Sequence, residues 1–322
     1  MAIKEEENAL TSIGHTCDSS PSRTALDPSL LSELEKLEST EQNILTEFLK
    51  RAQRDRSVNG QMDELAFVVN GLKDFPTKDE WLNRIKLRGR IAPELHKEHV
   101  GIEKIPLSFE SGHLNKPLSE VIRNRASCRD FDKSDLPFET LSSLLYQSCG
   151  VRGTFRAYNR PRVPLRYFPS GGGLQCVDVY LAVNDVEKIP QGLYRYNPIL
   201  NCLEQMERGN FRQRVVDCCF MCKWMATAGA VFFIVSNLPR LAWKYGGYQS
   251  YRLAHLDVGI VSQNLHLVAS ALGLGSCMVF GFSDQDADIL LGIDGRHEFT
   301  TLLIPVGRKL DTESFINKGI ER

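Results

Sequence analysis

The first candidates for chemistry in this sequence are two short clusters of basic residues. Arg125, Ser127 and Arg129 lie within five residues of one another, so two guanidiniums and a hydroxyl can converge on one anion. Guanidinium groups bind phosphate oxygens through paired N–H bonds, which suits this cluster to a phosphate. Near the C-terminus, Pro305–Lys309 places Arg308 directly after an apolar segment, which again favours an anion. Taken alone, either cluster is also typical of a solvated chain end.

A second candidate is the glycine-rich stretch Pro169–Gly173, which includes Ser170 and Gly171 and directly precedes an apolar segment. Consecutive glycines leave backbone amides open to a ligand, as in anion-binding nests. The stretch has neither the spacing and lysine of a P-loop nor the pattern GxGxxG, so no nucleotide motif applies. A flexible turn is the structural alternative.

The segment Trp243–Ser276 carries two further kinds of candidate. At its start, Lys244 and Tyr245 follow a tryptophan and are groups that can transfer protons. A lysine acts as a base only where burial or a nearby cation favours its neutral form, and a surface loop is the alternative for this pair. Further along, Gln263 and Asn264 form a polar pair inside an apolar stretch, and backbone partners are the alternative to a cofactor there.

These residues must be positioned by a long helix, because apolar residues repeat at three- and four-residue steps between Ala254 and Leu272. Apolar side chains cover most of its circumference, which is typical of a helix buried in a large core or in an oligomer interface. Gly273 is placed to end the helix, and Gly275 allows the backbone to approach another group closely.

Helices and strands alternate from Leu118 onward, which predicts an α+β domain with a mixed sheet packed around the long helix. Residues 1–27 are polar and predict a disordered tail, 28–105 a small helical region, and 106–322 the main domain. The stretch Gly150–Pro164 predicts a long loop. The other expected helices are Leu118–Asn124 and Phe138–Ser148, and the expected strands are Val177–Val183, Leu193–Tyr196, Leu203–Met206, Ala230–Ser236, Cys277–Phe282 and Thr300–Val306.

Composition excludes several classes of protein. The 322 residues carry a formal net charge of −1, which argues against a nucleic-acid-binding protein. The longest apolar run, Ala226–Val235, is too short to cross a membrane, and the N-terminus lacks a secretory signal. Nine cysteines indicate reduced thiols, so we expect a cytoplasmic protein. The pair Cys219 and Cys222 has no complementary pair or histidine at zinc-site spacing, so no metal site is expected.

Together, the order of these motifs resembles the flavin-dependent nitroreductase superfamily. The motifs that carry this resemblance are Arg-x-Ser-x-Arg-x-Phe from Arg125, Pro-Ser-Gly-Gly from Pro169, Gly-x-x-x-Gln-Asn-Leu from Gly259, Gly-Leu-Gly from Gly273, and Pro-Val-Gly from Pro305. Within the superfamily the sequence is most similar to the SagB-type, or McbC-like, azoline dehydrogenases of ribosomal peptide biosynthesis. The stretch WKYGGYQSYRLAHLDVGIVSQNL carries that finer resemblance, which spans about Leu118 to Arg308.

The resemblance implies that FMN binds at the interface of a homodimer. Arg125, Ser127, Arg129 and Arg308 would then hold the phosphate and ribityl chain. The resemblance also places two residues beside the isoalloxazine, from the partner subunit, and three more along the same pocket: Ser170 and Gly171, then Gln263, Gly273 and Gly275. Ala126 stands where many members carry a second arginine, which puts one phosphate contact in doubt.

The implied reaction oxidises a thiazoline or oxazoline in a precursor peptide to the aromatic azole. A hydride passes to flavin N5 and a protein base takes the other proton, with Lys244 and Tyr245 in the catalytic Lys-Tyr position. A YcaO-type cyclodehydratase and an E1-like protein are the implied partners. Two alternatives stay open: a stand-alone NAD(P)H-dependent nitroreductase or quinone reductase, and a non-catalytic subunit that holds FMN for fold stability.

Overall fold

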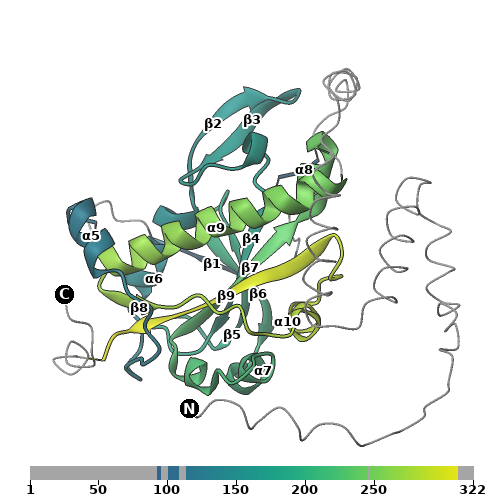
Figure 1. Cartoon of the computed structure of the whole chain (residues 1–322). Coiled ribbons are helices and arrows are strands. Elements are labelled where there is room, and N and C mark those ends of the chain that lie inside the picture. Colours follow the sequence, from purple (N-terminus) through teal and green to yellow (C-terminus); the bar gives the residue numbers. More distant parts are fainter. Residues whose placement is uncertain (1–92, 96–100, 109–113, 246, 311–322) are drawn as a thin grey trace, which may run out of the picture. The chain divides into compact units, whose positions relative to one another are not determined.

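A seven-stranded antiparallel sheet forms the centre of the part of the chain that the structure describes (Figure 1). The computed structural model describes residues 93–95, 101–108, 114–245 and 247–310, so the predicted tail over 1–27 and most of the predicted helical region over 28–105 lie outside them. In sheet order the strands are β1 (Lys104–Pro106), β6 (Cys202–Arg208), β5 (Gly192–Asn197), β4 (Val177–Val183), β7 (Ala230–Asn237), β9 (Glu298–Arg308) and β8 (Leu274–Ser276).

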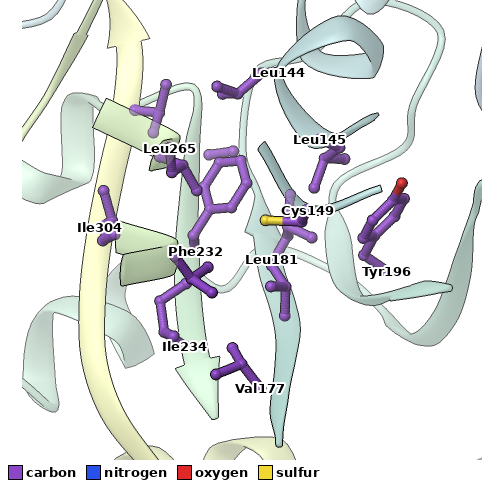
Figure 2. Packing of buried hydrophobic residues seen from close by; sticks show 14 of the residues in the cluster. Leu144, Leu145, Cys149, Val177, Leu181, Tyr196, Phe232, Ile234, Leu265 and Ile304 are labelled. Carbon is purple, nitrogen blue, oxygen red and sulfur yellow. The ribbon is translucent and has the colours of Figure 1, made fainter. Parts of the chain in front are cut away.

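The central strands are buried on both faces, because their alternate side chains enter two different cores. In β4, Val179 and Leu181 belong to one core while Tyr180 and Ala182 belong to the other. The same alternation runs along β7 and β9, as expected from the two-residue period of a strand. Figure 2 shows the first core, where Phe232 and Ile304 from the sheet meet Leu265 from a helix.

Two helices cover the first face. The long helix α9 (Gly247–Ala271) crosses it together with α6 (Phe138–Cys149) (Figure 1). Ala254, Val258, Val261 and Leu265 are the buried stripe of α9, so the predicted helical period is confirmed. The helix stops two residues before Gly273, whose φ of +79° is readily available only to glycine.

The second face is covered by α7 (Arg212–Asp217) and α10 (Asp284–Leu291), which contribute Val215, Ala287 and Leu290 to the second core. The remaining helical elements lie at the ends of the sheet and of α9. They are α5 (Leu118–Asn124), α8 (Leu238–Tyr245) and the 3₁₀ turns η2 (Gly171–Gly173) and η3 (Lys223–Thr227).

The predicted loop at Gly150–Pro164 is wrong. These residues form most of a two-stranded hairpin, β2 (Val151–Ala157) and β3 (Arg160–Arg166), which pairs separately from the main sheet. Tyr158 and Asn159 make the reversal with φ of +55° and +57°, the left-handed conformation that a tight hairpin turn requires. The arginines and prolines that suggested a loop are compatible with strands here because both strands of a two-stranded sheet are edge strands.

The predicted α+β class is confirmed, and the pairing of the main sheet is more regular than the mixed sheet that was expected. Each of its strand pairings is antiparallel, and among the described residues parallel pairing occurs only at isolated bridges such as Ser127 with Ser276. The strand expected at Cys277–Phe282 is also wrong. The short strand β8 ends at Ser276, and the following residues make only single bridges to Leu303 and Cys219.

Within the described residues, no helix combines the length and apolarity needed to span a membrane.

Candidate functional site

The predicted phosphate-binding cluster lies along the end of the sheet. The segment after α5 runs beside β8, where Ser127 bridges to Ser276 and the Cys128 amide donates to the Ser276 carbonyl over 2.9 Å. A few residues on, the Asp132 amide donates to the Arg308 carbonyl, also over 2.9 Å. The fold therefore brings the Arg125–Arg129 segment next to the strand end that carries Arg308.

This close approach depends on two glycines in the strands. A Cβ at Gly275 would lie 2.6 Å from Cys128 Sγ, and one at Gly307 would lie 2.8 Å from Phe131 Cδ1. Phe131 is itself buried, so its ring has little room to move away. Gly275 of Gly-Leu-Gly and Gly307 of Pro-Val-Gly thus allow the basic segment to pack closely against the sheet.

A buried histidine adjoins the cluster. His266 of α9 shares a 2.6 Å hydrogen bond between its Nδ1 and Ser276 Oγ, while its Nε2 has no partner within the described part of the chain. Burial, reinforced by the positive charge of Arg125, lowers the pKa of His266 to about 4. The imidazole is therefore neutral near pH 7. Its unpaired nitrogen and the adjacent cations fit a polar anionic group bound at this end of the sheet.

The glycine-rich turn is organised by a carboxylate from α9. Asp257 accepts from Ser170 Oγ at 2.6 Å and from the Gly171 amide at 3.0 Å, and the Cys176 thiol donates to it at 3.3 Å. Ser170 Oγ in turn accepts from the Gln175 amide at 2.9 Å. Because Asp257 is buried and satisfies several donors at once, Ser170 and Gly171 are held in one geometry.

The predicted catalytic pair lies against this same turn. A Cβ at Gly172 would be 2.8 Å from Lys244 Nζ and 2.7 Å from Tyr245 Oη, so both side chains close over the turn. Lys244 Nζ donates to Tyr158 Oη over 3.0 Å, and that hydroxyl donates to the Gly172 carbonyl. Lys244 Nζ also lies 5.2 Å from the ring centres of Tyr158 and Tyr245. The Lys244 amine is thus held by the Tyr158 hydroxyl and lies near two aromatic rings.

The helix that carries this pair is fixed to the sheet by a buried ion pair. Arg240 of α8 donates to Asp178 of β4 at 3.1 and 2.8 Å and to the Gln175 carbonyl at 2.8 Å. Burial alone would raise the pKa of Asp178, but the guanidiniums of Arg240 and Arg195 hold it well below its usual range. Lys244 lies one helical turn after Arg240, so this anchor sets its position.

Within a single chain, the basic cluster does not meet the glycine-rich turn and the Lys244–Tyr245 pair that lies against it. The turn contacts α9 at Asp257, whereas Ser276, which bridges to Ser127 of the basic cluster, contacts it at His266, nine residues later. These positions are about 14 Å apart along the helix axis and on roughly opposite sides of it. Gln263 and Gly273 are both exposed, and Gln263 lines an open groove beside Pro169.

Three residues at these sites were missed from the sequence. Tyr158 lies in the stretch that was predicted as a loop, and neither Asp257 nor His266 was among the predicted site residues. Asp257 lies well inside α9, where a buried carboxylate needs partners, and this was the available signal. No sequence signal pointed to Tyr158.

The cysteine cluster lies elsewhere, between α7 and η3. Cys219 and Cys222 are free thiols, and burial raises the pKa of Cys219 to about 12. Among the described residues no group of three or more His, Cys, Asp or Glu side chains is arranged to hold a metal ion.

Comparison with known proteins identifies relatives with similar sequences. The chain is 30% identical to the nitroreductase homologue MJ1384 of Methanocaldococcus jannaschii over 60% of its own length and 92% of that protein. It is 22% identical to the trifolitoxin-processing protein TfxB of Rhizobium leguminosarum bv. trifolii, over 67% of this chain and 63% of TfxB.

Solved structures share the fold. A nitroreductase homologue from Ralstonia eutropha aligns with a TM-score of 0.52 and 22% identity over 67% of this chain and 93% of its own. A chain of the E. coli microcin synthetase McbBCD complex with truncated pro-MccB17 aligns with a TM-score of 0.53 and 18% identity, covering 90% of this chain and 100% of that one. The sequence model of the nitroreductase family matches residues 122–308, which is more than half of the chain and runs from within α5 to the end of β9. The chain therefore belongs to the nitroreductase family, a class of oxidoreductases.

Proposed function

We propose that this protein is an FMN-dependent dehydrogenase that oxidises azolines to azoles in a ribosomally made peptide. The observation that carries the proposal is the placement of Lys244 and Tyr245 over the Ser-Gly-Gly turn. There Lys244 Nζ is held by Tyr158 Oη at 3.0 Å. A reductase that only passes electrons between a nicotinamide and an acceptor has no need of a positioned protein base there.

The residues fit FMN at two places. Arg125, Ser127, Arg129 and Arg308 would hold the phosphate and ribityl chain, and within the described residues no carboxylate makes an ion pair with the three arginines. Unpaired, clustered guanidiniums are suited to a phosphate. Four further residues complete the proposed pocket, the first two from the partner subunit: Ser170 and Gly171, then Gln263 and Gly273.

The assignment of Ser170 and Gly171 to the partner rests on the distance between the two sites in one chain. The exposed face of α9 supports a homodimer. Leu256 and Ile260 are 57% and 38% exposed, and with Tyr167 they line a largely apolar groove of about 510 Å³. An apolar helix face of this kind is typical of a subunit interface.

Azole formation removes two electrons and two protons from the azoline ring. When bound, FMN supplies the oxidation by accepting a hydride. The protein must take up the other proton, and Lys244 with Tyr245 is the base we assign. Tyr158 orients Lys244, and the anchor between Arg240 and Asp178 holds its helix. The turn over which the pair lies is kept in place by Asp257.

Two proteins similar to this chain support a role in peptide modification, since one is named for processing trifolitoxin and the other is a chain of a microcin synthetase complex with truncated pro-MccB17 bound. We extend the proposal to the partners that the family resemblance implies, a YcaO-type cyclodehydratase and an E1-like protein.

The test is the visible spectrum of the purified protein under anaerobic conditions. We expect a yellow flavoprotein that is bleached by an azoline-containing peptide and not by NADPH. Lys244→Ala should keep the flavin and lose the bleaching, while the surface variant Lys223→Ala should behave as the wild type. Failure to load the purified protein with FMN would refute the proposal. Lys244→Ala that bleaches at the wild-type rate would remove the assigned base.

The similarity to MJ1384 favours a second candidate, a stand-alone NAD(P)H-dependent reductase. Bleaching by NADPH and not by the azoline would select it. A non-catalytic FMN-holding subunit would be bleached by neither.

A further inference from the structure

The hairpin β2–β3, residues 151–166, is unusually basic, and we refer to it as the basic ribbon. It contains five arginines and no acidic residue, although the whole chain has a net charge of −1. Figure 1 shows the ribbon standing apart from the main sheet, beside α8. This concentration of positive charge on a hairpin that pairs separately from the main sheet needs a reason other than folding.

Two of the five arginines have structural partners. Arg166 is buried and donates to the Val177 carbonyl over 3.0 Å, and Arg160 also has a partner. The other three, Arg152, Arg156 and Arg162, are exposed, and no carboxylate in the described part of the chain pairs with them. Three exposed cations on one hairpin, without a paired carboxylate among the described residues, form a surface suited to an anionic partner.

The spacing of these cations favours an extended partner over a compact one. Arg152 and Arg156 are four residues apart on one strand, a separation of up to about 13 Å. A single phosphate needs donors that converge, whereas carboxylates distributed along a chain match donors distributed along a strand.

The strand edges of the basic ribbon also favour an extended partner. Pro161 and Pro164 remove amide donors from β3. The strand β2 contains no proline and, in the part of the protein that the structure describes, pairs only with β3. The outer edge of β2 therefore offers backbone groups to a peptide that adds as a further strand.

The ribbon also leads to the candidate catalytic pair. Its turn carries Tyr158, whose hydroxyl bonds Lys244 Nζ, and Phe155 packs against Gly173 of the glycine-rich turn. A peptide lying along β2 would thus be directed toward Lys244 and Tyr245. We propose that the basic ribbon docks an acidic, extended segment of the substrate peptide and so selects substrates by charge. This inference rests on the proposed function.

The test measures binding to the full-length, FMN-loaded protein by fluorescence anisotropy. The probes are two labelled peptides, one of alternating Glu and Val and one in which every Glu is Gln. We expect the wild type to bind the Glu peptide at least about tenfold more tightly at low salt, with the preference falling as salt rises. The triple variant Arg152→Glu/Arg156→Glu/Arg162→Glu should lose the preference.

A matched variant, Lys104→Glu/Arg208→Glu/Lys223→Glu, makes the same change in net charge at exposed sites on other elements and should keep the preference. Unchanged binding in the ribbon variant, or an equal loss in the matched variant, would overturn the proposal. So would displacement of the Glu peptide by NADPH or by single-stranded RNA at lower concentration, because the ribbon would then be a nucleotide site. Bleaching by an azoline is measured separately. Bleaching without charge preference refutes the ribbon alone, and charge preference without bleaching refutes the proposed function alone.

Discussion

The buried imidazole of His266 makes the stability of the apoprotein depend on pH. The side chain is 2% exposed, and burial together with Arg125 lowers its pKa from 6.5 to about 4. Between these values the unfolded chain binds a proton that the folded protein does not. The stability that depends on a neutral His266 is therefore fully present above about pH 6.5 and is lost as the pH falls toward about 4. At about pH 5 the loss amounts to about 2 kcal/mol of the free energy of unfolding.

Urea denaturation of the flavin-free protein at about pH 7.5 and about pH 5 measures this effect, in the wild type and in His266→Asn. Asparagine keeps a polar partner for Ser276 Oγ and does not titrate in this range. Other groups titrate alike in both proteins, so the difference between their pH dependences isolates the histidine. We expect the wild type to lose about 2 kcal/mol more than the variant. Equal losses would refute the assignment of a buried, neutral imidazole.

Three further substitutions test the packing of the site. Asp257→Asn removes the charge that accepts from the Ser-Gly turn at 2.6 and 3.0 Å, and urea denaturation should show a loss of about 2 kcal/mol. Tyr158→Phe removes the hydroxyl that holds Lys244, so kcat for azoline oxidation should fall about tenfold with little change in KM. Gly307→Ala places a Cβ 2.8 Å from the buried Phe131 ring. It should cost about 1 to 3 kcal/mol of stability and weaken FMN binding in a fluorescence titration.

The control for the glycine substitution is Gly153→Ala, where no atom lies within 4 Å of the added Cβ. We expect stability within about 0.5 kcal/mol of the wild type. If Gly307→Ala were tolerated as well as this control, the basic segment would not depend on close packing against β9. Full stability in Asp257→Asn would mean that the turn is held by other contacts. A raised KM with unchanged kcat in Tyr158→Phe would make that residue a binding group.

The central strands and helices could be predicted because their patterns are local. The expected strand Val177–Val183 and helix Leu118–Asn124 agree with the structure residue for residue, and the expected strand Ala230–Ser236 is only one residue short. A run of β-branched and aromatic residues identifies a strand wherever it packs. The hairpin β2–β3 could not be predicted in this way, because arginine, glycine and proline do not mark a strand.

The sequence alone determined the α+β class, the long helix and the order of the motifs that indicate a flavin site, since each depends on residue types at short spacing. Only the tertiary structure decided which of those motifs meet. It set the basic segment against Ser276, Asp257 against the Ser-Gly turn, and Tyr158 against Lys244, and each of these pairs is separated by 86 or more residues. Contacts at such separation depend on how the sheet orders its strands, and no local pattern encodes them.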